Sequence, residues 1–177
     1  MRWLYEKLRV GGVVIDVSRR KMVFCVQRES PRQAEIEALL RQSDQVAARL
    51  YPGEFRRSLD AEALDAPHIS VLVARRDDLV AVGCCALFDS GDGAAELKRM
   101  IVGERFRGLG AGVALLEAAE TNARSNGIHL IRMEVGIRNT EGQALYRKAG
   151  YGERAPFGSY RPSPISLFFE KIIGIDA

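Results

Sequence analysis

The chain has 177 residues, of which 47% are hydrophobic and six are proline, and its formal net charge at pH 7 is +3. This length and composition fit one compact domain with a sizeable core and leave little room for a second domain. The small positive charge does not require a nucleic acid partner, although it is compatible with an anionic small ligand. Because the sequence has neither a membrane-length apolar run nor a signal-peptide pattern, we expect a soluble, cytoplasmic protein.

The cysteines and histidines offer no metal site or disulfide framework. Cys25, Cys84 and Cys85 form no Cys-x-x-Cys pair, and His68 and His129 lie far apart in sequence without a partner at ligand spacing. The adjacent Cys84 and Cys85 would point to opposite faces of a strand, with no histidine nearby in sequence to act as a base. We therefore expect no bound metal and no cysteine nucleophile.

The first 21 residues are basic and show no sustained period, so we interpret them as an extension before a single domain over residues 22–177. An alternating run over residues 22–28 predicts a strand. Ser30, Pro31 and Gln33 match the start pattern of a helix, which the apolar spacing extends to about residue 50. A second, short helix is predicted over residues 58–64.

The rest of the chain alternates strands and helices. Three strands are predicted in succession, with turn-rich breaks that indicate an antiparallel meander. A long helix, a strand, a second helix and a last strand follow. This order predicts an α/β fold in which one mixed sheet has helices on both faces. These elements are expected over residues 69–74, 79–88, 96–102, 110–125, 130–135, 140–149 and 165–171.

A glycine-rich segment from Arg105 to Gly112 connects the third strand of the meander to the long helix. Closely spaced glycines let a ligand approach the backbone, and the first N–H groups of the following helix favour an anion. Arg105 and Arg107 would add charge-assisted contacts to the same anion. The segment therefore predicts a phosphate or pyrophosphate site.

Three phosphate-binding motifs compete for this segment. A P-loop is excluded because no lysine with a following serine or threonine comes after the glycines. A dinucleotide-binding fingerprint would need glycine where Val113 stands, although Glu134 ends the next strand where a ribose-binding acid would lie. Against that motif, the preceding strand contains Glu96, Lys98 and Arg99, whereas a central parallel strand should be nearly all apolar.

The third motif is the Arg/Gln-x-x-Gly-x-Gly/Ala loop, which fits in registers beginning at Arg105 and at Arg107. With Glu96-Leu-Lys-Arg-Met-Ile-Val before it and Asn139-x-x-x-x-Ala-x-Tyr146-x-x-x-Gly-Tyr after it, the chain resembles the GNAT superfamily of N-acetyltransferases. The resemblance covers roughly residues 22–172 and extends to a group of small bacterial acetyltransferases. It implies a mixed, mostly antiparallel sheet of about six to seven strands, in which two parallel strands splay apart to bind the cofactor.

The resemblance also implies which residues bind acetyl-coenzyme A. The splayed strands would be residues 96–102 and 130–135, and the main chain near Met100 would form a bulge that aims an N–H at the thioester carbonyl. The implied coenzyme-binding residues are Met100, Ile101, Val102, Arg105, Arg107, Gly108, Leu109, Gly110, Ala111, Gly112, Asn139 and Tyr146.

Two residues are implied in catalysis. Glu96 matches the position of the catalytic glutamate in histone-modifying members of the family and is the candidate general base; the alternative is a strand charge paired with Lys98 or Arg99. Tyr146 is the candidate acid for the departing thiolate, and the alternative is a core tyrosine. Asn139 lies about two helical turns of ~3.6 residues before Tyr146, so both can face the coenzyme, but a plain helix cap, favoured by a capping-box pattern from Thr140 to Gln143, would also explain Asn139.

The sequence therefore predicts an acetyl-coenzyme A-dependent N-acetyltransferase that acts by direct attack in a ternary complex. The expected acceptor is a primary amine of a small molecule or amino acid, lying against the first helices and the 155–164 loop, with Arg154 or Arg161 receiving a carboxylate. A protein lysine or amino terminus is the alternative acceptor. A nicotinamide-dinucleotide-dependent oxidoreductase and a non-catalytic acyl-coenzyme A-binding protein stay open as other classes, as does a homodimer; no nucleic acid or membrane partner is expected.

Overall fold

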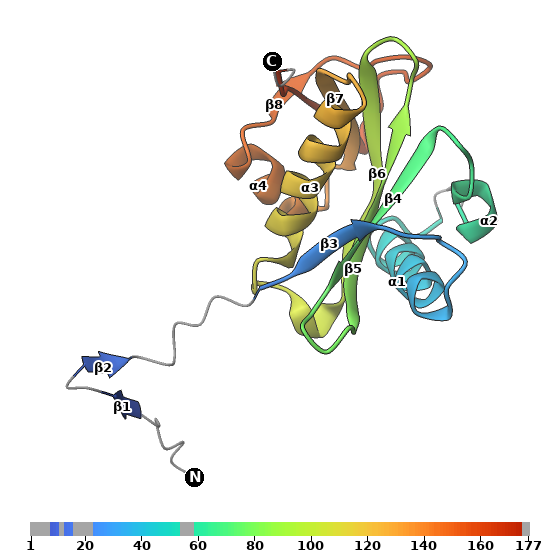
Figure 1. Ribbon diagram of the computed structural model, residues 1–177. Helices are drawn as coiled ribbons and strands as arrows, with labels where there is room; N and C mark the ends of the chain where they lie inside the picture. Colours follow the sequence, from blue (N-terminus) through green and yellow to red (C-terminus); the bar gives the residue numbers. More distant parts are fainter. Residues whose placement is uncertain (1–7, 11–12, 16–22, 54–58, 175–177) are drawn as a thin grey trace.

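The computed structural model describes residues 8–10, 13–15, 23–53 and 59–174. Its main body is a seven-stranded sheet in the order β3-β4-β5-β6-β7-β9-β8, with helices on both faces (Figure 1). Among the described strands only β6 and β7 pair in parallel. This architecture confirms the predicted mixed, mostly antiparallel sheet. The strands are β3 Cys25–Arg28, β4 Ile69–Arg75, β5 Ala81–Asp89, β6 Ala94–Val102, β7 Leu130–Gly136, β8 Gly152–Arg154 and β9 Ser166–Ile172.

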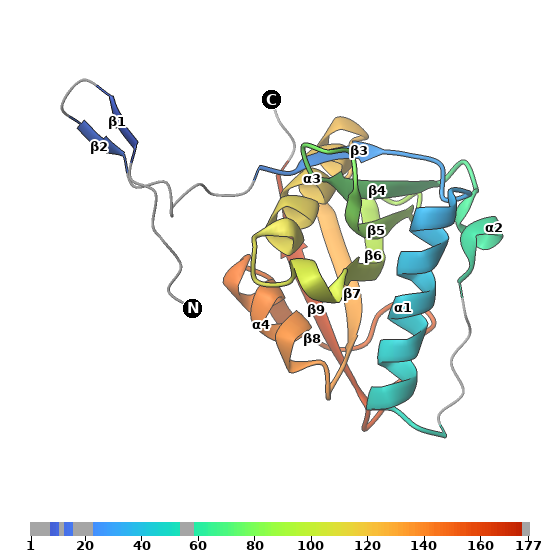
Figure 2. The same cartoon turned by 90° about the horizontal axis from the view of Figure 1, so that it is seen from below.

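The helices divide between the two faces of the sheet. Figure 2 shows α1 on one side of the sheet and α3 and α4 on the other. Two buried clusters correspond to these two layers, one under α1 and α2 and one under α3 and α4. The helices are α1 Ala34–Leu50, α2 Ala61–Leu64, α3 Ala111–Ser125 and α4 Thr140–Lys148, with a short 3₁₀ turn, η2, over Glu104–Phe106.

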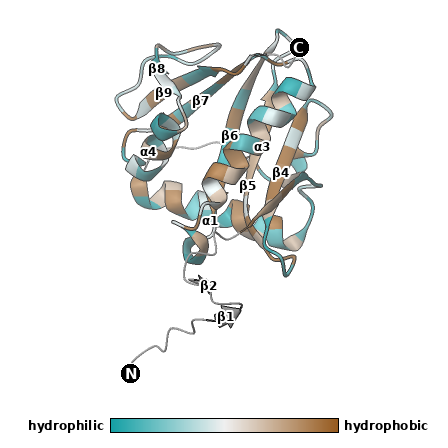
Figure 3. Ribbon diagram, turned by 60° about the vertical axis from the view of Figure 1, so that its left-hand side comes forward, coloured by the Kyte–Doolittle hydropathy of each residue, from teal (hydrophilic) through white to brown (hydrophobic). Residues whose placement is uncertain are grey.

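Strand alternation supplies both clusters from the same central strands. On β4, Val73 packs toward α1 whereas Leu72 packs toward α3, and on β5, Cys84 and Cys85 divide in the same way. Successive side chains of a strand point to opposite faces, so a strand covered on both faces must be apolar throughout. Figure 3 shows this as largely brown β4 and β5. The prediction that the adjacent cysteines lie on opposite faces is confirmed.

The predicted start of the first helix is wrong. α1 begins at Ala34, and its N-cap is Gln33, whose side chain makes no capping bond. Instead, the Gln33 amide donates to Glu29 Oε2 at 2.8 Å and to the Ser30 carbonyl at 3.1 Å. Ser30 Oγ accepts only from the Arg32 N–H, at 3.3 Å, which is too early in the chain to cap the helix. Ser30 and Gln33, the predicted cap and its predicted partner, therefore stabilise the turn before the helix instead.

The other short elements also differ in their ends. α2 begins at Ala61 with the Asp60 side chain as its cap, later than the expected start at residue 58, which lies outside the described residues. The strand β3 occupies only the last part of the predicted run over residues 22–28, and residue 22 is likewise outside the described residues. β8 was not predicted. Each described helix is too short or too polar to cross a membrane.

A separate two-stranded sheet lies within the predicted extension over residues 1–21. β1 Leu8–Val10 pairs with β2 Val13–Ile15 in antiparallel register, with Leu8 opposite Ile15. This two-stranded sheet is not hydrogen-bonded to the seven-stranded one. The remainder of the predicted extension lies outside the described residues, so the domain boundary near residue 22 stays a prediction.

Candidate active site

The parallel pair of strands separates partway along its length. β6 and β7 pair at Ala94 with Leu130, at Ala95 with Ile131 and at Glu96 with Arg132, and no later pair is formed between the described residues of these two strands. Both strands nevertheless continue, β6 paired with β5 and β7 paired with β9. Their facing edges therefore leave backbone N–H and C=O groups without a strand partner, and such groups favour an extended ligand that bonds like an added strand.

A β-bulge stands on β6 beyond the point of separation. Cys84 of β5 pairs with Ile101 of β6, and Ala86 of β5 pairs with Lys98 of β6. Two residues of β6, Arg99 and Met100, therefore lie opposite a single residue of β5. Arg99 has a φ of 54°, in the left-handed region that non-glycine residues rarely adopt. The bulge expected near Met100 is thus present, and a bulge of this kind redirects the local main chain.

The Arg99 side chain fixes the bulge to the first helix. Its guanidinium forms an ion pair with Asp44 and donates to the Leu40 carbonyl at 2.8 Å, both on α1. Only 12% of this side chain is exposed. The strained residue of β6 is therefore bound to α1, which forms the opposite wall of the cavity described below.

The glycine-rich turn leads into α3 in the expected way. Gly110 is the N-cap with a φ of 99°, and Gly108 has a φ of 73°; both conformations favour glycine. The first amide that bonds back to the turn is that of Ala114, which donates to the Gly110 carbonyl at 3.0 Å. The three preceding N–H groups, of residues 111–113, have no intrahelical acceptor, and the first turn contains no acidic residue. This helix end can therefore receive an anion.

One cavity of about 1780 Å³ extends from the gap between the separated ends of β6 and β7, past the β6 bulge, to the start of α3. Its walls come from the carboxyl-terminal half of α1, from β6 and the end of β7, from the first turns of α3 and α4, and from the segment after β8. Arg105 and Leu109 do not line it. The predicted site residues that do are Glu96, Met100, Ile101, Val102, Arg107, Gly108, Gly110, Ala111, Gly112, Asn139 and Tyr146.

The two arginines of the turn lie in different surroundings. Arg107 lines the cavity, lies 3.5 Å from Glu141 and donates to the Val102 carbonyl at 3.4 Å. Arg105 is exposed, and its guanidinium lies 5.7 Å from the centre of the Phe106 ring. The structure therefore places Arg107, and not Arg105, against the cavity.

Tyr146 and Asn139 approach the cavity from α4. Tyr146 is 7% exposed, and its ring centre lies 6.2 Å from that of Tyr151 and 6.3 Å from that of Phe169. Burial raises the pKa of the Tyr146 phenol, so the hydroxyl stays protonated at neutral pH. Asn139 is the N-cap of α4, and its side chain accepts from the Gly142 N–H at 3.1 Å. Tyr146 is thus both a core residue and a cavity residue.

The cap of α4 differs from the predicted capping box. The residue expected to complete that box, Gln143, donates to the carbonyls of Gly136 and Ile137 at 3.1 and 2.9 Å. These carbonyls belong to the last residue of β7 and to the residue after it, so Gln143 fixes α4 to the strand that borders the gap. Asn139 is the cap of α4, which is the alternative role considered for it in the sequence.

Glu96 has a partner that sequence reasoning did not identify. The Tyr160 hydroxyl donates to Glu96 Oε1 at 2.6 Å, and Lys98 Nζ lies 2.9 Å from the same oxygen. Lys98 Nζ also donates to the Tyr160 hydroxyl oxygen at 3.0 Å. Burial, followed by the hydrogen bond to Glu96, raises the pKa of Tyr160, which keeps this hydroxyl a donor. The ion pair with Lys98 considered for Glu96 is present, and Glu96 also lines the cavity.

Of the two arginines considered for a substrate carboxylate, only one lines the cavity. Arg154 is paired with Glu170 and donates to the Ala155 carbonyl at 2.8 Å. Arg161 lines the cavity and donates only to the Tyr160 carbonyl, at 3.2 Å; no acidic side chain in the described part of the chain pairs with it. Arg161 therefore has donors left for a ligand.

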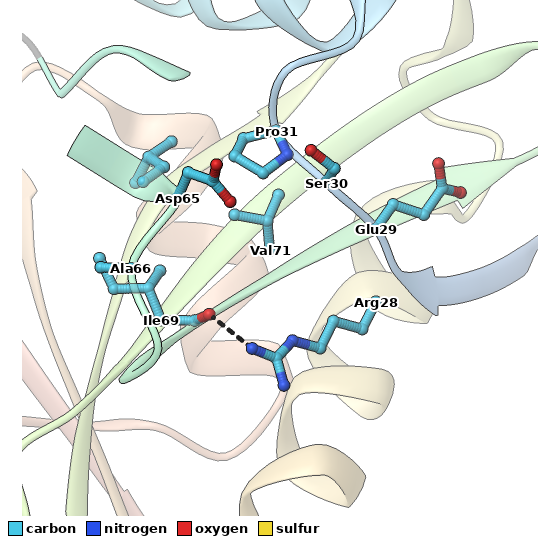
Figure 4. A pocket seen from close by; sticks show the side chains of 9 residues that line it. Arg28, Glu29, Ser30, Pro31, Asp65, Ala66, Ile69 and Val71 are labelled. Atoms are coloured by element: carbon cyan, nitrogen blue, oxygen red, sulfur yellow. Dashed lines mark hydrogen bonds between the residues drawn. The ribbon is translucent and has the colours of Figure 1, made fainter. Parts of the chain in front are cut away.

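A second, smaller cavity of about 300 Å³ lies between the end of β3, α2 and the start of β4 (Figure 4). It shares no lining residue with the large cavity and contains none of the predicted site residues. Arg28 spans one side and donates to the Ile69 carbonyl at 3.2 Å, while Asp65 pairs with Arg32 at 2.6 Å. The charged side chains of this cavity are thus engaged within the protein, and the larger cavity is the candidate active site.

Comparison with known proteins gives the class of the protein. Residues 33–151 match the Acetyltransferase (GNAT) family. The IAA acetyltransferase of Azospirillum brasilense is 43% identical over 147 residues, which are 82% of this chain and 95% of that protein. The chain therefore belongs to the GNAT family of acetyltransferases, and it is an acyltransferase enzyme.

Solved structures support the same assignment. A structure from Klebsiella pneumoniae subsp. pneumoniae MGH 78578, named as an acyl-CoA N-acyltransferase, superposes with a TM-score of 0.74 at 31% identity and covers 85% of this chain and 98% of its own. The ribosomal-protein-S18-alanine N-acetyltransferase of Escherichia coli superposes with a TM-score of 0.65 at 14% identity, covering 88% and 97%, and is similar in fold alone. The family uses acetyl- or another acyl-coenzyme A as its donor.

Proposed function

We propose that this enzyme transfers an acetyl group from acetyl-coenzyme A to the primary amine of a small molecule. The observation that carries the proposal is the end of the β6–β7 ladder at Glu96 and Arg132, which opens onto the same cavity as the β6 bulge and the start of α3. An extended thioester with an anionic end needs both an open strand edge and an anion site. This cavity provides them together.

The described residues fit the donor from end to end. The inner edge of β6 at Met100 and Val102, which has no strand partner among the described residues, would bond the amides of the pantetheine arm. The free N–H groups at the start of α3 would receive the pyrophosphate, with Arg107 beside them. At Gly108, an added Cβ would meet nothing within 4 Å, so the backbone is accessible there.

Acetyl-coenzyme A would supply an acetyl group activated as a thioester. The amine attacks the carbonyl carbon only after it has lost its ammonium proton, and Glu96 is proposed to accept that proton. The N–H of Met100, turned by the bulge, would stabilise the carbonyl oxygen as it becomes negatively charged. Tyr146 would donate a hydrogen bond to the departing sulfur as the carbon–sulfur bond breaks.

The acceptor proposed here is an amine that also has a carboxylate, as an amino acid does. Arg161 supports this proposal, because it lines the cavity next to Tyr160 and has no acidic partner among the described residues. A planar guanidinium matches a carboxylate with two parallel hydrogen bonds. The related protein of Azospirillum brasilense is named for a small molecule, IAA, which is consistent with a small acceptor.

The experiment that tests the proposal follows thiol release from acetyl-coenzyme A across a panel of amino acids and their decarboxylated amines. We expect saturable, acceptor-dependent thiol release matched by an equal amount of N-acetyl product, with amino acids as the better acceptors. Acetyl-coenzyme A should also raise the melting temperature, and NAD should not. Tight binding without turnover on any amine would instead indicate a non-catalytic acyl-coenzyme A-binding protein.

A further inference from the structure

The two oxygens of the Glu96 carboxylate have different surroundings. Oε1 accepts from the Tyr160 hydroxyl at 2.6 Å and lies 2.9 Å from Lys98 Nζ. Oε2 receives no hydrogen bond from any residue in the ranges 23–53 and 59–174. A carboxylate can accept about four hydrogen bonds, so one whole oxygen is left for a ligand. Because Glu96 lines the large cavity, that ligand would be one bound there.

The two groups that contact Oε1 are themselves fixed by packing. The Tyr160 ring centre lies 5.1 Å from that of Phe157 and 5.4 Å from that of Phe168. Lys98 Nζ lies 5.5 Å from the centre of the Phe88 ring and 5.4 Å from that of Tyr160, within the range of cation–π attraction. The Tyr160 ring loses little conformational entropy on ordering, so its packing holds the hydroxyl at low cost.

The three groups also form a closed triangle. Lys98 Nζ donates to the Tyr160 hydroxyl oxygen at 3.0 Å, and both groups reach the same carboxylate oxygen. The Glu96 side chain is 16% exposed, and rotating it would break two contacts at once. The triangle therefore constrains the direction of the carboxylate as well as its place.

We propose that Tyr160 and Lys98 are positioning residues for the acceptor amine: they hold Oε1 of Glu96 and thereby present Oε2 to the amine. This inference rests on the proposed function, in which Glu96 accepts the amine's proton. In that step an N–H bond of the acceptor ammonium breaks and an O–H bond forms at Oε2, leaving the nitrogen lone pair free to attack. The proton then passes to solvent. In this role Tyr160 and Lys98, which line the same cavity, act through Glu96.

The first test is the substitution Tyr160→Phe, which keeps the ring and its packing and removes only the hydroxyl. We expect kcat/KM for the acceptor to fall about tenfold or more, the size expected for losing a hydrogen bond to a charged group. The rise in melting temperature caused by acetyl-coenzyme A should be unchanged. For the second donor, Lys98→Arg should retain more activity than Lys98→Met, because only the former keeps a cationic donor.

A double-mutant cycle distinguishes a positioning role of Tyr160 from a general loosening of the 155–164 loop that contains it. In a Glu96→Gln background, Tyr160→Phe should cost less than about twofold, because its effect passes through the carboxylate. The control is Phe157→Leu, which disturbs the same ring cluster without removing a bond to Glu96 and should cost the same in both backgrounds. If Glu96→Gln leaves too little turnover, Glu96→Asp serves as the background, since it withdraws the carboxylate from the hydroxyl.

The outcomes are distinct. Equal losses from Tyr160→Phe in both backgrounds, or no loss in the wild-type background, would overturn the positioning role while leaving the enzyme an acetyltransferase. Absence of acceptor-dependent thiol release from the wild-type enzyme with every amine would instead refute the proposed function itself.

Discussion

Glu96 and Arg132 form the last pair of the parallel ladder between β6 and β7, and each strand runs on past this pair without the other. The two side chains lie on the same face of the sheet, where Arg132 packs over the Phe157 ring at 5.1 Å. The ladder therefore ends beside both the candidate base and the Arg132–Phe157 contact.

Gly110→Ala should weaken the binding of acetyl-coenzyme A. A non-glycine residue in the left-handed conformation of Gly110 costs about 1–2 kcal/mol, and relief of that strain would shift the first turn of α3. We expect the Kd for acetyl-coenzyme A, measured by calorimetry, to rise about tenfold. Gly127→Ala is the matched control, since Gly127 has a φ of 73° and open space around it at the other end of α3. It should lose similar stability and leave the Kd unchanged.

Tyr146→Phe should lower turnover and leave donor binding nearly intact. The substitution keeps the buried ring and removes the hydroxyl proposed to assist the leaving thiolate, so kcat should fall about 100-fold or more. Steady-state kinetics and the Kd for acetyl-coenzyme A together check this. Tyr151→Phe removes a hydroxyl from the neighbouring ring, which does not line the cavity, and should have a much smaller effect. Similar losses from both variants would assign Tyr146 to the core alone.

Arg161→Gln should change the choice of acceptor. If Arg161 binds the acceptor carboxylate, its loss should raise KM for amino acids about tenfold and leave KM for the matching decarboxylated amines unchanged. Arg154→Gln is the control, because Arg154 is already paired with Glu170 and does not line the cavity. A KM that rises equally for both kinds of amine would contradict the role of Arg161.

The free energy of unfolding should fall in alkaline solution. Burial raises the pKa of Cys84 to about 12 and raises that of Cys85 as well. Between the ordinary thiol pKa of about 8.5 and these folded values, the unfolded chain releases protons that the folded chain keeps. Each thiol should therefore remove about 1.4 kcal/mol of stability per pH unit above pH ~8.5, an effect absent at lower pH.

Denaturant unfolding at a series of pH values measures this effect. Whatever stability Cys84→Ala loses at neutral pH, its further loss between about pH 8.5 and pH 10.5 should be smaller than that of the wild type. Cys25→Ala is the control, because Cys25 is exposed and its replacement should leave the slope unchanged. Parallel curves for all three proteins would show that the buried thiols do not govern the alkaline loss.

Local patterns in the sequence were sufficient for the order of the elements from β3 to β9, with the exception of β8, and for the start of α3. Apolar alternation in β4 and β5 and the glycines before α3 are signals that a few neighbouring residues determine. The family resemblance added the splayed strands and the bulge, which no local pattern indicates. Side chains that could hydrogen-bond to any of several nearby groups were less predictable. Gln33 uses its amide on Glu29, and Gln143 bonds the end of β7 instead of closing a capping box.

Two features needed the folded chain. β8 is three residues long, and two of them, Glu153 and Arg154, are charged, so its sequence has no alternating apolar signal. Tyr160 reaches Glu96 across 64 positions of sequence, from a loop rich in proline and glycine. The spacing of the two residues predicts no contact, because the loop's path depends on where β8 and β9 place its ends. A tyrosine in a conformationally restricted loop was the one available signal.

Amide hydrogen exchange with and without acetyl-coenzyme A tests the central claim most directly, because it reports on the backbone groups that the separation of β6 and β7 leaves free. Saturating acetyl-coenzyme A should slow exchange at Met100 and Val102 on β6 and at residues 111–113 of α3. The amides beside the small cavity, around Ile69 and Val71, should be unaffected. Unchanged exchange on β6 with saturating ligand, or protection confined to the small cavity, would contradict the placement of the coenzyme in the gap.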